Sequence, residues 1–272
     1  PTALAFLPHV ESSFNYRAYS KVGAAGMWQF MRSAAHTYGM KMNYLIDERR
    51  DPLISSRAAS RFLRDNYAKL QAWPLAITAY NHGPKSVEHA VQILGTRELS
   101  KIIDKYDNRR FGFASKNFYA TFVACAEISS EPEKYFPNYP KQTNPELAAI
   151  NLKQRMTMDQ IAKATGISKD RLQDFNLALR PAIFKSNFYL PKSFIVRVPV
   201  SGEAKVAELE DTVTVAAKEQ PIPVANVAGE EREHAVRPGD NLYTIAKMYD
   251  VEITDLIYRN GISQPSQLRP GM

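Results

Sequence analysis

Glu11 is the residue of the first segment best placed for acid–base chemistry. Leu4, Leu7, Glu11 and Phe14 stand at i, i+3, i+7 and i+10, so the spacing predicts a helix with Glu11 on its apolar stripe. Desolvation there would disfavour the ionised carboxylate and raise its pKa, which suits a general acid. The same spacing also fits a structural glutamate satisfied by hydrogen bonds or a neighbouring arginine, and spacing alone does not decide between the two.

Two further segments carry groups of the kind that contact sugars. Gly23-Ala24-Ala25-Gly26 is a small-residue loop that allows close approach of the backbone, and a helix is predicted to resume in Met27-Trp28-Gln29-Phe30-Met31. The segment Ala79-Tyr80-Asn81-His82-Gly83-Pro84 ends one predicted helix and starts another, placing a phenol and a carboxamide at a turn. Tyr80 also suits a core position and Asn81 a helix cap, so this segment by itself leaves both interpretations open.

Other chemistries have little support in the sequence. The single cysteine, Cys125, lies in an apolar helical setting and excludes an intrachain disulfide or a cysteine-based zinc cluster. No glycine-rich phosphate loop is present, and we expect no cofactor. The histidines lack the paired spacing of a metal site, so no metal is expected, and each is assigned a helical surface or core role: His9, His36, His82, His89 and His234.

The net charge of +7 is divided unevenly along the chain. Residues 1–139 hold 18 Lys and Arg against 12 Asp and Glu, residues 140–200 hold 10 against 4, and residues 201–272 hold 7 against 12. The excess of positive charge in residues 1–200 favours an anionic partner, which could be nucleic acid, anionic lipid or an anionic cell-wall polymer. Solvated lysines on the surface would give the same count.

The elements that must position these residues fall into four parts. Residues 1–139 show dense helical periodicity and predict an all-α domain, closed by a proline-rich connection. Residues 140–200 form a second module, residues 201–233 an acidic flexible linker, and residues 234–272 a third module. No apolar run is long enough for a membrane-spanning helix, and because the chain begins at Pro1 we expect a processed or truncated piece.

The second and third modules are predicted to be copies of each other. At an offset of 84 residues, Ile161-Ala162-Lys163 falls on Ile245-Ala246-Lys247. Further matches follow at the same offset: Met158 on Leu242, Ile167 on Val251, Leu172 on Leu256 and Asn176 on Asn260. Strand-like pieces at residues 149–152 and 194–198 flank the helices, which predicts a βααβ unit. The third module stops before its last strand, so we expect the native chain to continue.

The second module also has the pattern of a helix-turn-helix, with Gly166 in the turn. The equivalent segment of the third module has Asp250, Glu252 and Asp255 where a recognition helix would meet phosphate, and these charges repel nucleic acid. We therefore expect no nucleic-acid partner.

Several motifs together resemble one known family, the lytic murein transglycosylases of the soluble-lytic-transglycosylase type. The resemblance covers roughly residues 1–130 and is carried by Leu7-Pro8-His9-Val10-Glu11-Ser12-Ser13-Phe14, Ala18-Tyr19-Ser20, the stretch from Gly23 to Met31, and Ala79-Tyr80-Asn81-His82-Gly83. It implies a lysozyme-like all-α fold in which Glu11 is the catalytic acid and then the base. It also implies a set of substrate-binding residues: Ser20, Gly26, Gln29, Met31, Tyr80 and Asn81.

The late part of the domain departs from the family pattern. The family often has a Glu-Thr-x-x-Tyr-Val stretch where this chain reads Ala114-Ser115-Lys116-Asn117-Phe118-Tyr119. The family tyrosine falls on Phe118, and Tyr119 follows it, so Tyr119 is included among the substrate-binding residues.

The third module resembles a LysM module, through the run from Val236 to Ala246 and the later Asn260-Gly261-Ile262. LysM modules are implied to bind N-acetylglucosamine-containing glycans, and the implied binding residues are Gly239, Asp240, Asn241, Asn260 and Gly261. The second module lacks the Pro-Gly-Asp turn and resembles a divergent copy. The fold expected for the chain is thus mainly α, with small α+β LysM-type modules.

The resemblance implies an enzyme that cleaves the MurNAc–GlcNAc β-1,4 bond of peptidoglycan without water and leaves 1,6-anhydromuramyl ends. It implies a periplasmic or other envelope location in a Gram-negative bacterium, with any outer-membrane anchor in a segment outside this chain. Two alternatives stay open. A goose-type lysozyme-like hydrolase would need a second carboxylate, for which Asp47, Glu48 and Asp51 are candidates, and a peptidoglycan-binding scaffold would bind without turnover.

Overall fold

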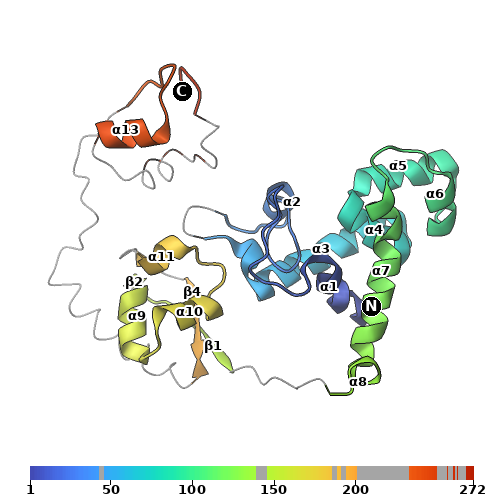
Figure 1. Ribbon diagram of the computed structural model, residues 1–272, viewed down its shortest axis with the longest axis horizontal. Coiled ribbons are helices and arrows are strands. Elements are labelled where there is room, and N and C mark those ends of the chain that lie inside the picture. Colours follow the sequence, from blue (N-terminus) through green and yellow to red (C-terminus); the bar gives the residue numbers. More distant parts are fainter. Residues whose placement is uncertain are drawn as a thin grey trace. The chain divides into compact units, whose positions relative to one another are not determined.

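The structure, a computed structural model, separates the chain into two compact units (Figure 1). Unit 1 comprises residues 1–41 and 48–143, and unit 2 comprises residues 42–47 and 144–272. Within these units the structure describes residues 1–42, 46–138, 146–185, 189–190, 194–200, 233–249, 256, 260, 262 and 268–272.

Unit 1 is helical throughout its named elements, which confirms the predicted all-α fold. Five of its α-helices carry a proline in their first turn, where the missing N–H has no helical partner and the fixed φ favours helix entry. In chain order the elements are η1 (Thr2–Phe6), α1 (Leu7–Ser12), α2 (Arg32–Thr37), η2 (Glu48–Arg50), α3 (Pro52–Leu70), α4 (Trp73–His82), α5 (Pro84–Leu94), α6 (Leu99–Lys105), α7 (Phe113–Ser130) and α8 (Pro132–Tyr135).

A buried cluster from α3, α4, α5, α6 and the connection that follows α6 forms a core of unit 1. Burial of these apolar side chains is the main favourable contribution to the fold, and the members are Leu70, Leu75, Ala79, Val87, Ala90, Leu99, Ile102, Tyr106 and Phe111. Helix α7 packs along α4 and also contacts α1 and η1, so this long helix supports the short helix that carries Glu11 (Figure 1).

The prediction of one helical stripe from Leu4 to Phe14 is wrong at both ends. Leu4 lies in the 3-10 helix η1, and α1 ends at Ser12 because Ser13 and Phe14 adopt left-handed φ angles of 51° and 57°. The Phe14 ring then packs edge-on against His9, with ring centroids 4.6 Å apart. Glu11 therefore lies in the last turn of a short helix.

The helix predicted to resume at Met27 begins instead at Arg32. Residues 26–29 form turns, since Gln29 has a left-handed φ of 47°, and Ala25 and Phe30 form an antiparallel bridge. The helix boundary predicted around Gly83 is confirmed, because α4 ends at His82, Gly83 has φ +98° and α5 begins at Pro84.

Unit 2 contains the second module, which has the predicted strand–helix–helix–strand order. Strand β1 (Leu147–Asn151) pairs antiparallel with β4 (Ile195–Pro199), with Ala149 opposite Arg197. Between them lie α9 (Met158–Thr165) and α10 (Lys169–Phe175). Two features of this module were not predicted: helix α11 (Pro181–Lys185) and a second short sheet, in which β2 (Met156–Thr157) pairs with β3 (Tyr189–Leu190).

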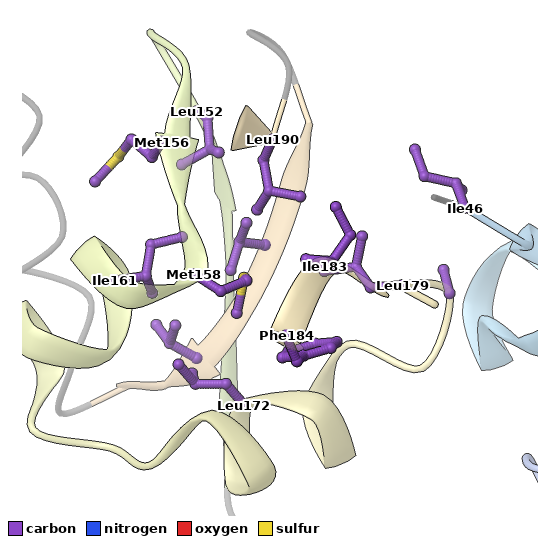
Figure 2. Close-up of a cluster of buried hydrophobic side chains, with 13 residues drawn as sticks. Ile46, Leu152, Met156, Met158, Ile161, Leu172, Leu179, Ile183, Phe184 and Leu190 are labelled. Atoms are coloured by element: carbon purple, nitrogen blue, oxygen red, sulfur yellow. The ribbon is translucent and has the colours of Figure 1, made fainter. Parts of the chain in front are cut away.

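The core of unit 2 lies between the helices and the sheets of this module (Figure 2). Met158, Ile161 and Leu172 come from the two repeated helices and are almost fully buried. Val196 and Val198 from β4 complete the cluster, so the alternation along this strand places one face on the core.

The offset of 84 residues is confirmed where both modules are described. Helix α9 begins with a capping box formed by Thr157 and Gln160, and α13 (Leu242–Met248) begins with a capping box formed by Asn241 and Thr244. Asn176 and Asn260 each donate a side-chain hydrogen bond to the carbonyl four residues earlier, at 2.8 and 2.9 Å. The two modules thus share local interactions and not only apolar spacing.

Candidate active site

Glu11 is a partly buried carboxylate without a partner that would stabilise its charge. Among the residues that the structure describes, none forms a hydrogen bond or an ion pair with this side chain, and burial raises its pKa from 4.5 to about 7. The alternative in which a neighbouring arginine satisfies Glu11 is therefore not what the structure shows. A carboxyl group in this state can hold a proton near neutral pH and release it when a base is needed.

Tyr80 from α4 lies close to Glu11. Burial raises the pKa of the Tyr80 hydroxyl well above its ordinary value, and the negative charge of Glu11 raises it further. The hydroxyl donates a 2.9 Å hydrogen bond to the carbonyl of Trp28, so its proton is directed at the backbone. The ring packs in a cluster with Trp28, Phe30 and Phe62, with centroid separations of 5.0–6.4 Å.

A compact loop of residues 19–30 stands next to the helix that carries Glu11. The Ser12 hydroxyl donates to the Met27 carbonyl at 2.9 Å, which ties the end of α1 to this loop. Within the loop, antiparallel bridges join Tyr19 to Ala25 and Ala25 to Phe30. The polar residues implied by the family resemblance therefore sit on a defined backbone and not on an open turn.

Arg49 from η2 fixes the loop of residues 19–30 through hydrogen bonds. Its side chain is fully buried, and its Nη1 donates to the carbonyls of Gly23 at 2.7 Å and Phe30 at 3.0 Å. A buried guanidinium is stable only when such acceptors replace water. Nothing in the sequence distinguishes Arg49 from its neighbour Arg50, so sequence reasoning could not have found this role.

Gly26 is required by the same packing. Its φ is +77°, and a Cβ built on it would lie 1.9 Å from the carbonyl oxygen of Arg49. A side chain at this position would clash with backbone, so the loop and η2 approach as closely as they do because residue 26 is glycine.

The other predicted binding residues are distributed around this loop. Ser20 closes the turn, since its Oγ accepts from the Ala24 N–H at 2.9 Å, and the Gln29 side chain donates to the Gly26 carbonyl at 2.7 Å. The Met31 side chain is 44% exposed at the end of the loop. Asn81 is exposed in the last turn of α4, directly after Tyr80.

Tyr119 contacts a different part of unit 1 from the other predicted binding residues. Its side chain packs against the buried cluster of α3–α6, and its ring centroid lies 6.2 Å from that of Phe122 in α7. Phe118 is almost fully buried. These contacts describe a packing role for both residues, and a contact of Tyr119 with substrate stays a prediction.

His82 links three helices behind the Tyr80–Asn81 turn. Its Nδ1 lies 2.9 Å from the Ser115 hydroxyl of α7, and its Nε2 lies 2.8 Å from the Ser86 hydroxyl of α5. Burial lowers the pKa of His82, which favours the neutral ring. These contacts agree with the structural role that the sequence indicated for the histidines.

In the third module, the predicted glycan-binding residues take part in turn and cap interactions. Gly239 has φ +94°, Asn241 caps α13, and the Asp240 carboxylate accepts from the Arg237 N–H at 2.7 Å and pairs with His234 at 2.8 Å. The hydrogen bond from the Arg237 N–H is the largest cause that lowers the pKa of Asp240, and the bond with His234 lowers it further. Asn260 caps the preceding turn, and Gly261 lies outside the described residues.

The described residues offer two further observations. Within them, no three side chains of the types His, Cys, Asp and Glu are grouped so that they could hold a metal ion. No helix in the same part of the chain is long and apolar enough to cross a membrane.

Comparison with known protein families assigns most of the chain. The Transglycosylase SLT domain matches residues 1–103, the LysM-like domain of lytic transglycosylase MltD matches residues 146–215, and the LysM domain matches residues 234–272. The chain therefore contains a Transglycosylase SLT domain followed by two LysM-type domains. This is the combination of domains that the motifs around Glu11, Gly26 and Tyr80 and the repeated modules predicted.

Individual relatives agree with this assignment. The membrane-bound lytic murein transglycosylases D of Escherichia coli K12 and of Escherichia coli O6:H1 are each 29% identical over 273 residues, which covers all of this chain and 59% of the relative. A putative tributyltin chloride resistance protein of Alteromonas sp. strain M-1 is 28% identical over 138 residues, covering 50% of this chain and 65% of that protein. The chain thus spans about three fifths of the length of the transglycosylases that it matches.

Proposed function

We propose that this protein is a peptidoglycan lytic transglycosylase that cleaves the MurNAc–GlcNAc β-1,4 bond and leaves 1,6-anhydromuramyl ends. The observation that carries the proposal is Glu11, a carboxyl group without a charged partner whose pKa burial raises to about 7, next to the loop of residues 19–30. The SLT domain and the LysM-type modules support the same polymer as substrate.

One carboxyl group is sufficient for this reaction. Protonated Glu11 donates its proton to the glycosidic oxygen as the bond from C1 of the muramyl residue breaks, and Glu11 becomes a carboxylate. The carboxylate then takes the proton of the C6 hydroxyl of the same residue, whose oxygen forms the new bond to C1. Glu11 ends protonated as it began, and no water is consumed. The tethered hydroxyl has a high effective concentration, which favours it over water.

The contacts of the early acids argue against the hydrolase alternative. A hydrolase of this class needs a second carboxylate within about 5 to 10 Å of the acid. Asp47 forms an ion pair with Arg180 at 3.1 Å inside unit 2, the Glu48 carboxylate accepts from the Lys41 N–H at 2.7 Å, and buried Asp51 caps α3. None of the three contributes to the raised pKa of Glu11, which has burial as its cause.

The loop and the α4 turn would bind the sugar next to Glu11. The Ser20 oxygen and the Gln29 amide N–H form hydrogen bonds within the loop. The hydroxyl proton of Ser20 and the side-chain carbonyl of Gln29 would then bind the ligand. Gly26 sets the shape of the loop, exposed Met31 offers an apolar surface, and Asn81 offers an amide beside Tyr80. Tyr119 is retained as a substrate contact of the same site.

The LysM-type modules would hold the enzyme on its polymer. We assign glycan binding in the third module to Gly239, Asp240, Asn241, Asn260 and Gly261, and linked modules raise the local concentration of the catalytic unit on a glycan strand. We propose that the protein acts in the periplasm of a Gram-negative bacterium, with outer-membrane attachment through a segment outside this chain. The name of its relatives, which are called membrane-bound, supports attachment to a membrane.

Mass spectrometry of the fragments released from purified peptidoglycan tests this function. Wild type and Glu98→Gln, an exposed acid of the same unit paired with Lys101, should release fragments with anhydro ends. Glu11→Gln should release none, since an amide cannot carry the proton. Reducing ends, heavier by one water, would establish a hydrolase, and glycan binding without release by wild type would establish a scaffold.

A further inference from the structure

The outer side of the loop of residues 19–30 presents an exposed aromatic ring with a fixed hydroxyl. The Tyr19 side chain is 54% exposed, although its backbone is held by the bridge to Ala25. The guanidinium of Arg49 lies 5.6 Å from the centre of its ring, and the Arg49 Nη2 lies 3.4 Å from its hydroxyl oxygen. Because Arg49 is itself buried and bonded to Gly23 and Phe30, it gives Tyr19 a rigid support.

A second cation, Arg32, also interacts with the Tyr19 hydroxyl. Burial raises the pKa of the Tyr19 hydroxyl, but hydrogen bonds and charge from Arg49 and Arg32 lower it by more, and the net shift is downward. Arg32 begins α2 directly after the exposed Met31, and its side chain is partly exposed. A phenol oxygen that accepts from arginine keeps its own proton for a donor bond to another acceptor.

The charged side chains of the segment that contains Tyr19 and Arg32 are all basic. From Ser12 to Ile46 the sequence contains no Asp or Glu, and it contains Arg17, Lys21, Arg32 and Lys41. Tyr19 and Arg32 therefore lie in a segment that contributes positive charge and no acid of its own. Such surroundings favour an anion over a neutral hydroxyl or amide.

We propose that Tyr19 and Arg32 form a subsite for a carboxylate of the substrate, namely the free carboxylates on the peptide stems of peptidoglycan. The inference rests on the proposed function and deepens it, because it makes the stems and not only the sugar chain part of what this enzyme recognises. Tyr19 donates one hydrogen bond to the carboxylate and Arg32 donates a charge-assisted one. The exposed ring supplies apolar contact for the stem.

The test compares native peptidoglycan with peptidoglycan whose stem carboxylates have been converted to carboxamides. Amidation removes the charge and leaves the glycan and the length of the stems unchanged. We expect wild type to show a higher kcat/KM for anhydro ends on native strands, and Arg32→Gln to lower the ratio of native to amidated about five-fold. Tyr19→Phe should lower the ratio in the same direction. Arg97→Gln, an exposed arginine between α5 and α6, should keep the wild-type ratio.

Two results would overturn the subsite. They are a wild-type ratio of one, and a ratio that stays at the wild-type value in both Arg32→Gln and Tyr19→Phe. Binding of native and amidated strands by the Glu11→Gln variant, with and without Arg32→Gln, gives a readout that does not depend on turnover. Absence of anhydro ends from wild type on both substrates would instead defeat the proposed function, and the binding ratio would still decide the subsite.

Discussion

The proposed role of Glu11 as a proton donor at neutral pH depends on a carboxyl group that burial has desolvated and that no cation among the described residues pairs with. Burial alone raises its pKa to about 7, and the nearby Tyr80 hydroxyl gives its proton to the Trp28 carbonyl and not to Glu11. A neutral carboxyl group is the stable form below that pH, which is the form that must protonate the leaving oxygen.

The pH dependence of turnover follows from this state. We expect kcat/KM to be level below about pH 7 and to fall about tenfold for each further pH unit, because the free enzyme then loses the proton of Glu11. Initial rates at low substrate concentration, measured across pH, check this. A rate that rises through neutral pH would show that the essential form of Glu11 is the carboxylate.

Stability should depend on the same proton with a defined sign. The pKa of Glu11 is raised in the folded state, so its stabilising contribution is complete below about pH 4.5 and is lost as pH rises through about 7. At about pH 8, Glu11→Gln should therefore be more stable than wild type by about 3 kcal/mol, since Gln is never charged. Denaturant unfolding at about pH 8 and pH 4 checks it, and an equal difference at both values would contradict the assignment.

At the scale of elements, the loop of residues 19–30 depends on its contact with η2. Gly26→Ala places a methyl group on the Arg49 carbonyl and should cost about 3 kcal/mol or more of unfolding free energy. Gly39→Ala is the matched control, because Gly39 has a similar φ of +75° but open space around it, and should cost about 1 kcal/mol. Chemical denaturation measures both, and equal losses would mean that the close contact does not matter.

Some elements could be predicted from local sequence and others could not. The break between α4 and α5 follows from Gly83-Pro84, and the capped repeat helices follow from apolar spacing, because both depend on residues close together in the chain. The end of α1 at Ser12 and the turns at residues 26–29 depend on contacts with Met27 and Arg49, which are distant in sequence. The apolar periodicity therefore predicted correctly that Glu11 lies on a helix, but the predicted helix was longer than the observed α1.

At the scale of the whole molecule, the chain combines an SLT domain with two LysM-type domains. The motifs indicated an SLT-type domain, LysM-type modules and a mainly α fold, which the comparisons and the structure confirm. The positions of Arg49 and Arg32 around Tyr19 were not predictable, since only the folded loop brings them to one hydroxyl. The motifs thus indicated the proposed transglycosylase reaction. The structure adds the side chains, such as Arg49, that fix the loop next to Glu11.

The most direct measurement of the central claim is cleavage of peptidoglycan in water enriched in heavy oxygen, followed by mass spectrometry of the new ends. Since the C6 hydroxyl of the sugar and not water attacks C1, we predict anhydro ends without heavy oxygen, formed by wild type and absent with Glu11→Gln. New ends that are heavier by one labelled water would contradict the account, because they would show that water completes the reaction.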